Sequence, residues 1–180
     1  MANSSYIYAA TEAEGGDRIL LGQHDGSVPL VFKILLSADA EKHTEADSDA
    51  AFLSGDFAGG VQRLEQFIDD LGPGSGAGLN RKEFRRSAET ARMVLNSKRL
   101  RNCRYIVLDC SQVLDGSGVD SLLSEVRNIN DTIDSDPILV GDRASSLSAL
   151  LHNQSLVTPD DEAGVRRVSE IGLASIGAGK

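Results

Sequence analysis

One stretch of the sequence decides the fold: residues 50–71, which read AAFLSGDFAGGVQRLEQFIDDL. In its second half the apolar side chains recur at steps of four, three, four and three, which is the period of one helical face. They are Phe57, Val61, Leu64, Ile68 and Leu71, with Phe67 beside them.

Both ends of this helix are marked in the sequence. Asp56 precedes the series, where a carboxylate accepts hydrogen bonds from the free N–H groups of a first helical turn. Gly72 and Pro73 follow the series and predict its end. The short apolar run at residues 50–53 predicts a buried strand just before the helix. We therefore expect strand, tight turn and helix to form the nucleus on which the rest of the chain packs.

Composition indicates an ordinary globular domain. The 180 residues suit one domain, and 41% hydrophobic with 25% charged residues is the usual balance. No apolar run approaches the roughly 18 residues that a membrane span needs, and no basic, apolar leader opens the chain. Cys103 and Cys110 are too far apart in one extended segment to form a disulfide. Two free thiols and no signal predict a cytoplasmic protein. The lack of a long apolar run predicts that the protein has no membrane partner.

Charge is distributed unevenly. The net charge is −9, but between Arg81 and Arg104 nine cations stand against two carboxylates, a balance of +7 that leaves −16 elsewhere. This field favours a cationic partner and disfavours nucleic acid. The basic segment has two possible roles. It could hold phosphate, or it could pair with the acidic remainder of the chain, which we favour because no aromatic residues are interleaved with its cations.

The remaining elements follow from shorter patterns. Strands are expected at residues 5–10, 18–21, 104–110 and 138–140, and helices at 80–96, 119–133, 145–151 and 159–171. Residues 29–37, PLVFKILLS, are near-continuously apolar, so they could form a helix opened by Pro29 or a buried strand. Residues 39–49 are polar and acidic and predict a surface loop.

These elements predict an α+β fold, with short strands packed with three or four amphipathic helices in a single layered domain. We place that domain at residues 1–171 and a frayed tail at 172–180. The glycine-rich residues 72–78, GPGSGAG, follow a helix rather than a strand. They therefore predict a flexible linker and not a dinucleotide-binding turn.

No pattern in the sequence carries a known catalytic chemistry. His24, His43 and His152 lie far apart in loop-like segments without metal-ligand spacing. There is no phosphate-binding loop, no serine lies in a G-x-S-x-G turn, and nothing connects a serine to a histidine base. Cys110 follows Asp109, whose charge disfavours a thiolate. The expectation is a protein that is not an enzyme, with no catalytic residue, cofactor or metal.

Several segments together resemble a family of uncharacterised bacterial proteins that open M-A-N-R-S-Y-L-Y. The shared segments are M-A-N-S-S-Y-I-Y at the start, the apolar segment after Pro29, S-G-D-F at residues 54–57 with the helix that follows, and I-V-L-D-C at residues 106–110. The resemblance covers roughly residues 1–133. This chain has Ser4 where the family has arginine, and it lacks the family's tryptophan-containing C-terminal segment. Some members resemble immunity partners of bacterial toxins.

The charge pattern and this resemblance lead to one functional expectation. The chain is expected to be an immunity protein that binds a cognate bacterial toxin with a basic surface and occludes its active site. The alternative is a cytosolic structural or regulatory accessory protein. The candidate partner-binding surface is a run of four acidic residues, Asp131, Asp134, Asp136 and Asp142.

Overall fold

The computed structural model describes residues 3–14, 16–44, 51–70 and 81–130. Within these ranges the elements in chain order are β1 (Ser4–Ala10), β2 (Arg18–Asp25), α1 (Leu30–Leu36), β3 (Glu41–Thr44), β4 (Ala51–Asp56), α2 (Phe57–Asp70), α3 (Arg81–Leu95), the short 3-10 helix η1 (Lys98–Leu100), β5 (Tyr105–Asp109) and α4 (Gly116–Arg127). The α+β class is confirmed. The expected linker at 72–78, the elements expected after residue 130 and the tail at 172–180 lie outside the described residues.

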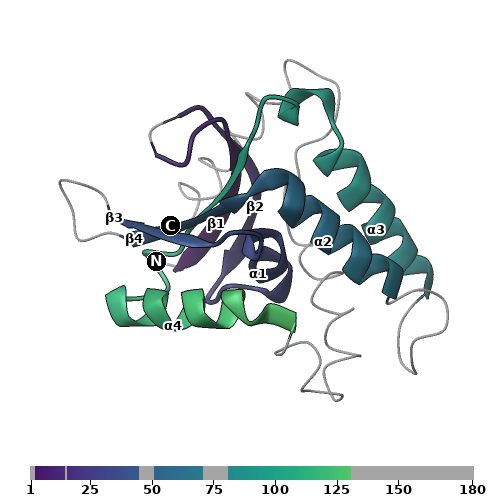
Figure 1. The fold of residues 1–180 in the computed structure, drawn as a ribbon. Coiled ribbons are helices and arrows are strands. Elements are labelled where there is room, and N and C mark those ends of the chain that lie inside the picture. The colour runs from purple at the N-terminus through teal and green to yellow at the C-terminus, as the bar shows by residue number, and fades with distance from the viewer. Residues whose placement is uncertain (1–2, 15, 45–50, 71–80, 131–180) are drawn as a thin grey trace, which may run out of the picture.

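The strands form one antiparallel sheet in the order β2-β1-β5-β4-β3 (Figure 1). Consecutive strands pair at both sides, β1 with β2 and β3 with β4. β5 is the last described strand along the chain but lies in the middle of the sheet, between β1 and β4. The two halves of the sheet are therefore joined only by a strand that is distant from both in sequence.

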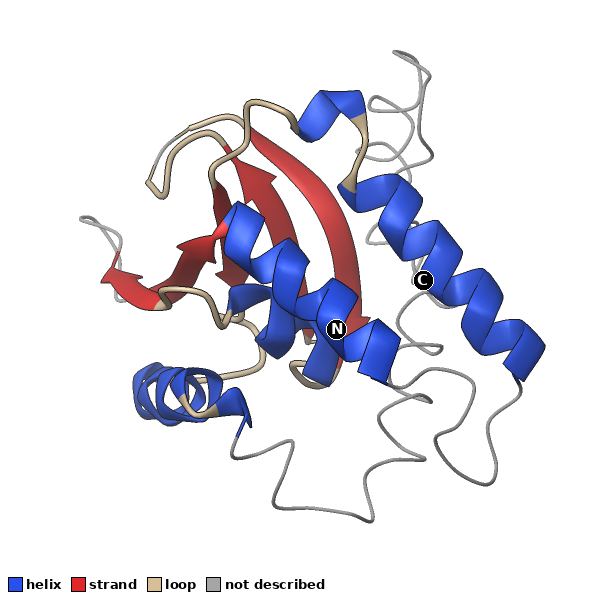
Figure 2. Cartoon of the chain, turned by 45° about the vertical axis from the view of Figure 1, so that its right-hand side comes forward, coloured by secondary structure: helices blue, strands red, loops and turns tan. Residues whose placement is uncertain are grey.

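Helices α1, α2 and α4 cover one face of this sheet, and α3 packs against α2 (Figure 2). Alternation along the strands sends every second side chain into the layer between sheet and helices. The largest fully buried side chains of this core come from both layers: Ile7, Leu53, Ile106 and Leu108 from the strands, and Phe32, Ile34, Leu36, Leu64, Val119 and Val126 from the helices.

The prediction for residues 50–71 is confirmed with one difference. β4 ends at Asp56 and α2 begins at Phe57, so no turn separates strand from helix. Asp56 Oδ2 accepts a hydrogen bond from the backbone N–H of Gly59 at 2.6 Å, which is the predicted cap. Leu64 and Ile68 are buried against the sheet.

Residues 29–37 form a helix, α1, which resolves the ambiguity of that segment. Five of its seven residues are buried, because α1 lies between the sheet and helices α2 and α4. A short helix enclosed in this way is apolar on nearly every side, so its pattern resembles that of a buried strand. Lys33 is its polar exception, and its Nζ lies 2.7 Å from Glu125 Oε1 of α4.

The expectation of a surface loop at residues 39–49 was wrong in part, because Glu41–Thr44 form the edge strand β3. This strand has no apolar residue, and its side chains are held instead by polar partners on β4, α4 and the β1–β2 loop. Charged residues on a short edge strand also discourage pairing with other chains. His24 and His43 therefore lie in strands, β2 and β3, and not in loops.

Candidate functional site

The sheet face opposite the helices carries a cluster of aromatic and polar side chains. Tyr6 and Tyr8 of β1 alternate with the core residues Ile7 and Ala9, and Tyr105 of β5 alternates with Ile106. All three tyrosines of the sequence therefore lie on this second face. A small core of buried residues, Ala10, Phe52 and Val107, lies there with Tyr8 and Tyr105 packed against it.

Arg18 reaches across this face from the edge of the sheet. It opens β2, yet its guanidinium carbon lies 5.2 Å from the centroid of the Phe52 ring on β4. Strands β1 and β5 separate β2 from β4, so the side chain spans two strands. The contact is a cation–π interaction.

His43 occupies the second side of the same cluster. It lies opposite Phe52 in the β3–β4 register, and the two rings stack with centroids 5.0 Å apart and an angle of 14° between planes. Its Nδ1 lies 2.7 Å from Glu14 Oε1 of the β1–β2 loop. Its Nε2 lies 2.7 Å from Ser54 Oγ on β4. We call Glu14, His43 and Ser54 the Glu–His–Ser chain.

The Glu–His–Ser chain has the atom order of a serine-hydrolase triad, carboxylate to imidazole to hydroxyl. A neutral ring protonated on Nδ1 donates to Glu14 and accepts from the Ser54 hydroxyl, and an imidazolium donates to both. Ser54, however, is only 3% exposed and lies on a strand paired on both sides, with Glu41 and with Val107. In this structure the Glu–His–Ser chain gives the buried Ser54 hydroxyl a hydrogen-bond partner and holds the β1–β2 loop against β3.

Burial and charge both act on the centre of this face. Burial, with the nearby Asp109 carboxylate and Tyr6, raises the pKa of Tyr8 to about 12, although the Arg18 cation opposes the shift. Cys110 follows β5 and lies in the main core on the helical side, where burial raises the pKa of its thiol to about 11 and Asp109 contributes in the same direction. Asp109 itself accepts hydrogen bonds from the N–H and hydroxyl of Ser111. Burial and the Asp109 charge both disfavour the thiolate of Cys110, which is the direction expected from the neighbouring Asp109.

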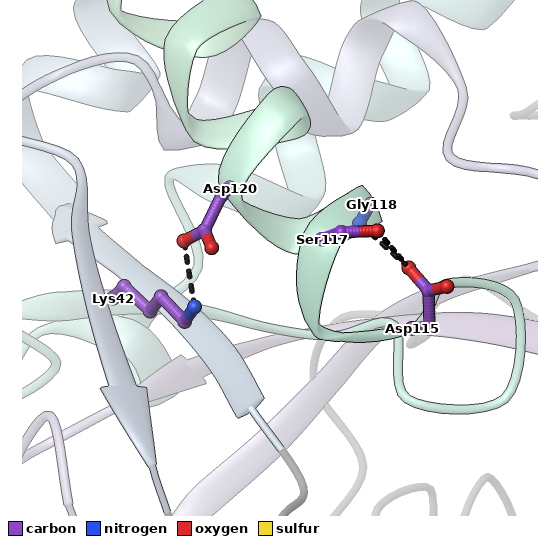
Figure 3. A network of polar contacts seen from close by, with 5 residues as sticks. All are labelled: Lys42, Asp115, Ser117, Gly118 and Asp120. Carbon is purple, nitrogen blue, oxygen red and sulfur yellow. Dashed lines mark hydrogen bonds and ion pairs between the residues drawn. The ribbon is translucent and has the colours of Figure 1, made fainter.

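A polar network ties α4 to the sheet on the helical side (Figure 3). Asp115 caps α4 by accepting from the N–H of Gly118 at 2.7 Å and from the Ser117 hydroxyl at 2.8 Å, and these hydrogen bonds lower its pKa. Lys42 of β3 lies 2.6 Å from Asp120 of α4. The acidic residues of α4 are thus engaged in capping and ion pairs within the molecule.

The acidic run proposed as the partner-binding surface, Asp131, Asp134, Asp136 and Asp142, lies outside the described residues. Sequence reasoning missed the link from His43 to Ser54. This contact depends on the pairing of β3 with β4. Because β3 has no apolar alternation, its sequence does not predict that pairing. Among the described residues, Arg92 of the basic segment forms an ion pair with Asp69 of α2. The wider pairing of this segment with the acidic remainder stays a prediction, because many of those acidic residues lie outside the described residues.

Comparison with known proteins places the chain in a family. A family model described as a domain of unknown function (DUF7822) matches residues 7–151. The chain belongs to the DUF7822 family. Neither the curated proteins nor the solved structures that were compared gave a match.

The DUF7822 match starts within β1 and includes every later described element. The five-stranded sheet, its helical layer and the Glu–His–Ser chain therefore all lie in the family's domain. None of the described helices has the length and hydrophobicity that crossing a membrane demands.

Proposed function

We propose that this DUF7822 chain is a non-catalytic binding protein, an immunity protein that neutralises a cognate bacterial toxin by covering its active site. The toxin presents a basic surface, and the complex forms in the cytoplasm. The two buried free thiols, Cys103 and Cys110, suit that reducing compartment.

The observation that carries this proposal is the acidic excess of the described surface. Outside residues 81–104, the described chain has fourteen carboxylates against five cations, and most of the carboxylates are exposed. Surface charge of one sign accelerates capture of a partner of the opposite sign without requiring a catalytic group. The exposed acids of the β1–β2 loop, Glu12, Glu14 and Asp17, add to this field.

Co-expression tests the proposal. The chain is co-purified with the product of the gene immediately upstream, and its protection of cells that express that product is measured. Association should slow steeply with added salt while dissociation changes little. If no toxin-like partner is captured and no protection is seen, the immunity function is rejected in favour of an accessory role.

Two charge variants locate the interface. Replacing Asp131, Asp134, Asp136 and Asp142 by asparagine should slow capture and weaken protection. The matched control, which removes the same number of charges from exposed positions with no ion pair among the described residues, replaces Glu12, Asp17, Asp39 and Glu41 by their amides. Equal slowing by both variants would show that only net charge matters and that the four aspartates are not the interface.

The Glu–His–Ser chain favours a second candidate function, serine-dependent acyl transfer. In such a reaction Ser54 Oγ attacks an acyl carbon, His43 takes its proton and returns it to the leaving group, and water then releases the acyl group. A fluorophosphonate probe tests this candidate. Mass-spectrometric labelling of Ser54 that is lost in His43→Gln supports an enzyme, whereas an unlabelled native protein agrees with the burial of Ser54 and with a structural role.

A further inference from the structure

The outer helix α3 and the 3-10 helix η1 present a basic surface that the proposed function does not use. Residues 85–104 hold one carboxylate, Glu89, and seven cations: Arg85, Arg86, Arg92, Lys98, Arg99, Arg101 and Arg104. Arg92 alone among these forms an ion pair with another described residue. In a chain with a net charge of −9, carboxylates are abundant, yet those of the described part leave this surface unneutralised.

The outward face of α3 also exposes an apolar side chain. Ala88, Ala91, Val94 and Leu95 are buried, while Arg85, Arg86, Glu89, Met93 and Asn96 point outward. Met93 is 55% exposed, whereas the other large hydrophobic side chains that the structure describes are buried or half-buried. α3 lies on the outer side of α2, away from the sheet (Figures 1 and 2). A helix face that exposes a methionine together with two arginines, Arg85 and Arg86, has the composition of a protein–protein interface, where both residue types are enriched.

Arg99 adds an independent observation. Its Nη1 atom is buried and has no hydrogen-bond partner. The described part of the chain therefore offers this guanidinium nitrogen no acceptor, so the Arg99 cation adds to the positive charge of the surface. Arg99 as a residue remains partly exposed.

We propose that α3 and η1 form a docking surface for an acidic protein, in which Met93 packs against an apolar side chain and Arg85, Arg86 and Arg99 pair with carboxylates. Nucleic acid is disfavoured on two grounds. Residues 85–104 contain no aromatic side chain on which a base could stack. The acidic remainder of the chain also repels a continuous polyanion.

Fluorescence anisotropy with defined probes tests this surface. The first probe is a labelled helical peptide of glutamate with leucine along one face; the second has serine in place of leucine; the third is a single-stranded DNA of equal charge. The first peptide should bind most tightly. Arg85→Gln with Arg86→Gln should weaken it about three- to tenfold at low salt, and Met93→Ser should weaken it about threefold while leaving the serine peptide unaffected.

A matched control separates local pairing from net charge. Ser121→Glu with Ser124→Glu on α4 changes the net charge by the same two units, from −9 to −11, at exposed positions on a different helix. This control should weaken binding by less than about twofold.

Four results would overturn the proposal: no binding of the leucine peptide by the wild type, equal losses in the arginine variant and the control, tighter binding of the DNA, or insensitivity to Met93→Ser. Sedimentation equilibrium of the wild type supplies a fifth. Self-association that is abolished by the arginine variant would identify the occupant as a second copy of the chain.

Discussion

Replacing Gly60 by alanine should destabilise the protein, although alanine is the better helix former. Gly60 lies buried in α2, where this helix meets the end of α1. A Cβ atom at this position would lie 1.9 Å from the carbonyl oxygen of Leu35 and 2.9 Å from its carbonyl carbon. Close carbon–oxygen contacts in proteins are about 3.3 Å, so the two helices would have to separate locally by roughly 1.4 Å.

The size of the effect follows from two opposing contributions. Alanine gains about 1 kcal/mol over glycine in a helix interior. Against this gain, overpacking a tight contact typically costs about 1–3 kcal/mol and occasionally more. The added Cβ would meet the backbone carbonyl oxygen of Leu35, which cannot rotate away as a side chain can. Separating the helices also weakens their packing, because a gap of about 0.5–1 Å already loses about a quarter to a half of the dispersion energy of the α1–α2 contact. Taking the upper end of the overpacking cost, about 3 kcal/mol, and subtracting the helix gain of about 1 kcal/mol, we expect a net loss of about 2 kcal/mol.

Urea unfolding measures this loss as a lower midpoint with an unchanged m-value. The matched control is Gly116→Ala in the first turn of α4, where an added Cβ meets nothing within 4 Å. That variant should be unchanged or more stable by up to about 1 kcal/mol. A Gly60→Ala protein as stable as the wild type would refute the close approach of α1 to α2.

The remaining predictions concern the core, the buried thiol and a helix cap. Leu64→Ala should cost about 2–5 kcal/mol in urea unfolding, whereas the exposed Gln66→Ala on the same helix should stay within about 0.5 kcal/mol; similar losses at both positions would show that the buried face is misassigned. Because burial and Asp109 raise the pKa of Cys110 to about 11, iodoacetamide at neutral pH should leave it unmodified until urea unfolds the chain; rapid alkylation of the native protein, seen by mass spectrometry, would contradict its burial. Because hydrogen bonds lower the pKa of Asp115 in the folded state, the wild type should be more stable than Asp115→Ala above the ordinary aspartate pKa, and this advantage should vanish as pH falls through the lowered pKa; an advantage that persists in acid would mean that the cap does not depend on the carboxylate.

The sequence predicts those elements whose signals are local. The helix after Asp56 shows its cap and its apolar period within a few residues, and the helix that buries Val119, Leu122 and Val126 shows its apolar period. The class of the fold follows from such elements. The position of β5 between β1 and β4 does not, because pairing between segments distant in the chain leaves no local pattern.

The candidate site escaped sequence analysis for the same reason. Glu14, His43 and Ser54 come from a loop and two strands, and only the register of β3 on β4 brings His43 and Ser54 to one face. A shift of that register by one residue would send His43 to the helical side and remove both of its hydrogen bonds. β3 has no apolar alternation to fix the register. Its side-chain partners on neighbouring elements do so instead, and they become visible only in the folded structure.

The two proposed surfaces have opposite signs, and this makes them separable in one measurement. A basic toxin is attracted by the acidic excess and repelled by the cations of α3, so Arg85→Gln with Arg86→Gln should leave its association rate unchanged or raise it modestly. The same variant should weaken binding of an acidic partner, because it removes charges that pair with that partner's carboxylates. If this variant instead slows toxin capture, α3 belongs to the toxin interface, and the separation into two docking surfaces is wrong. If it affects neither partner, the cations of α3 serve no docking role, and the acidic excess alone governs association.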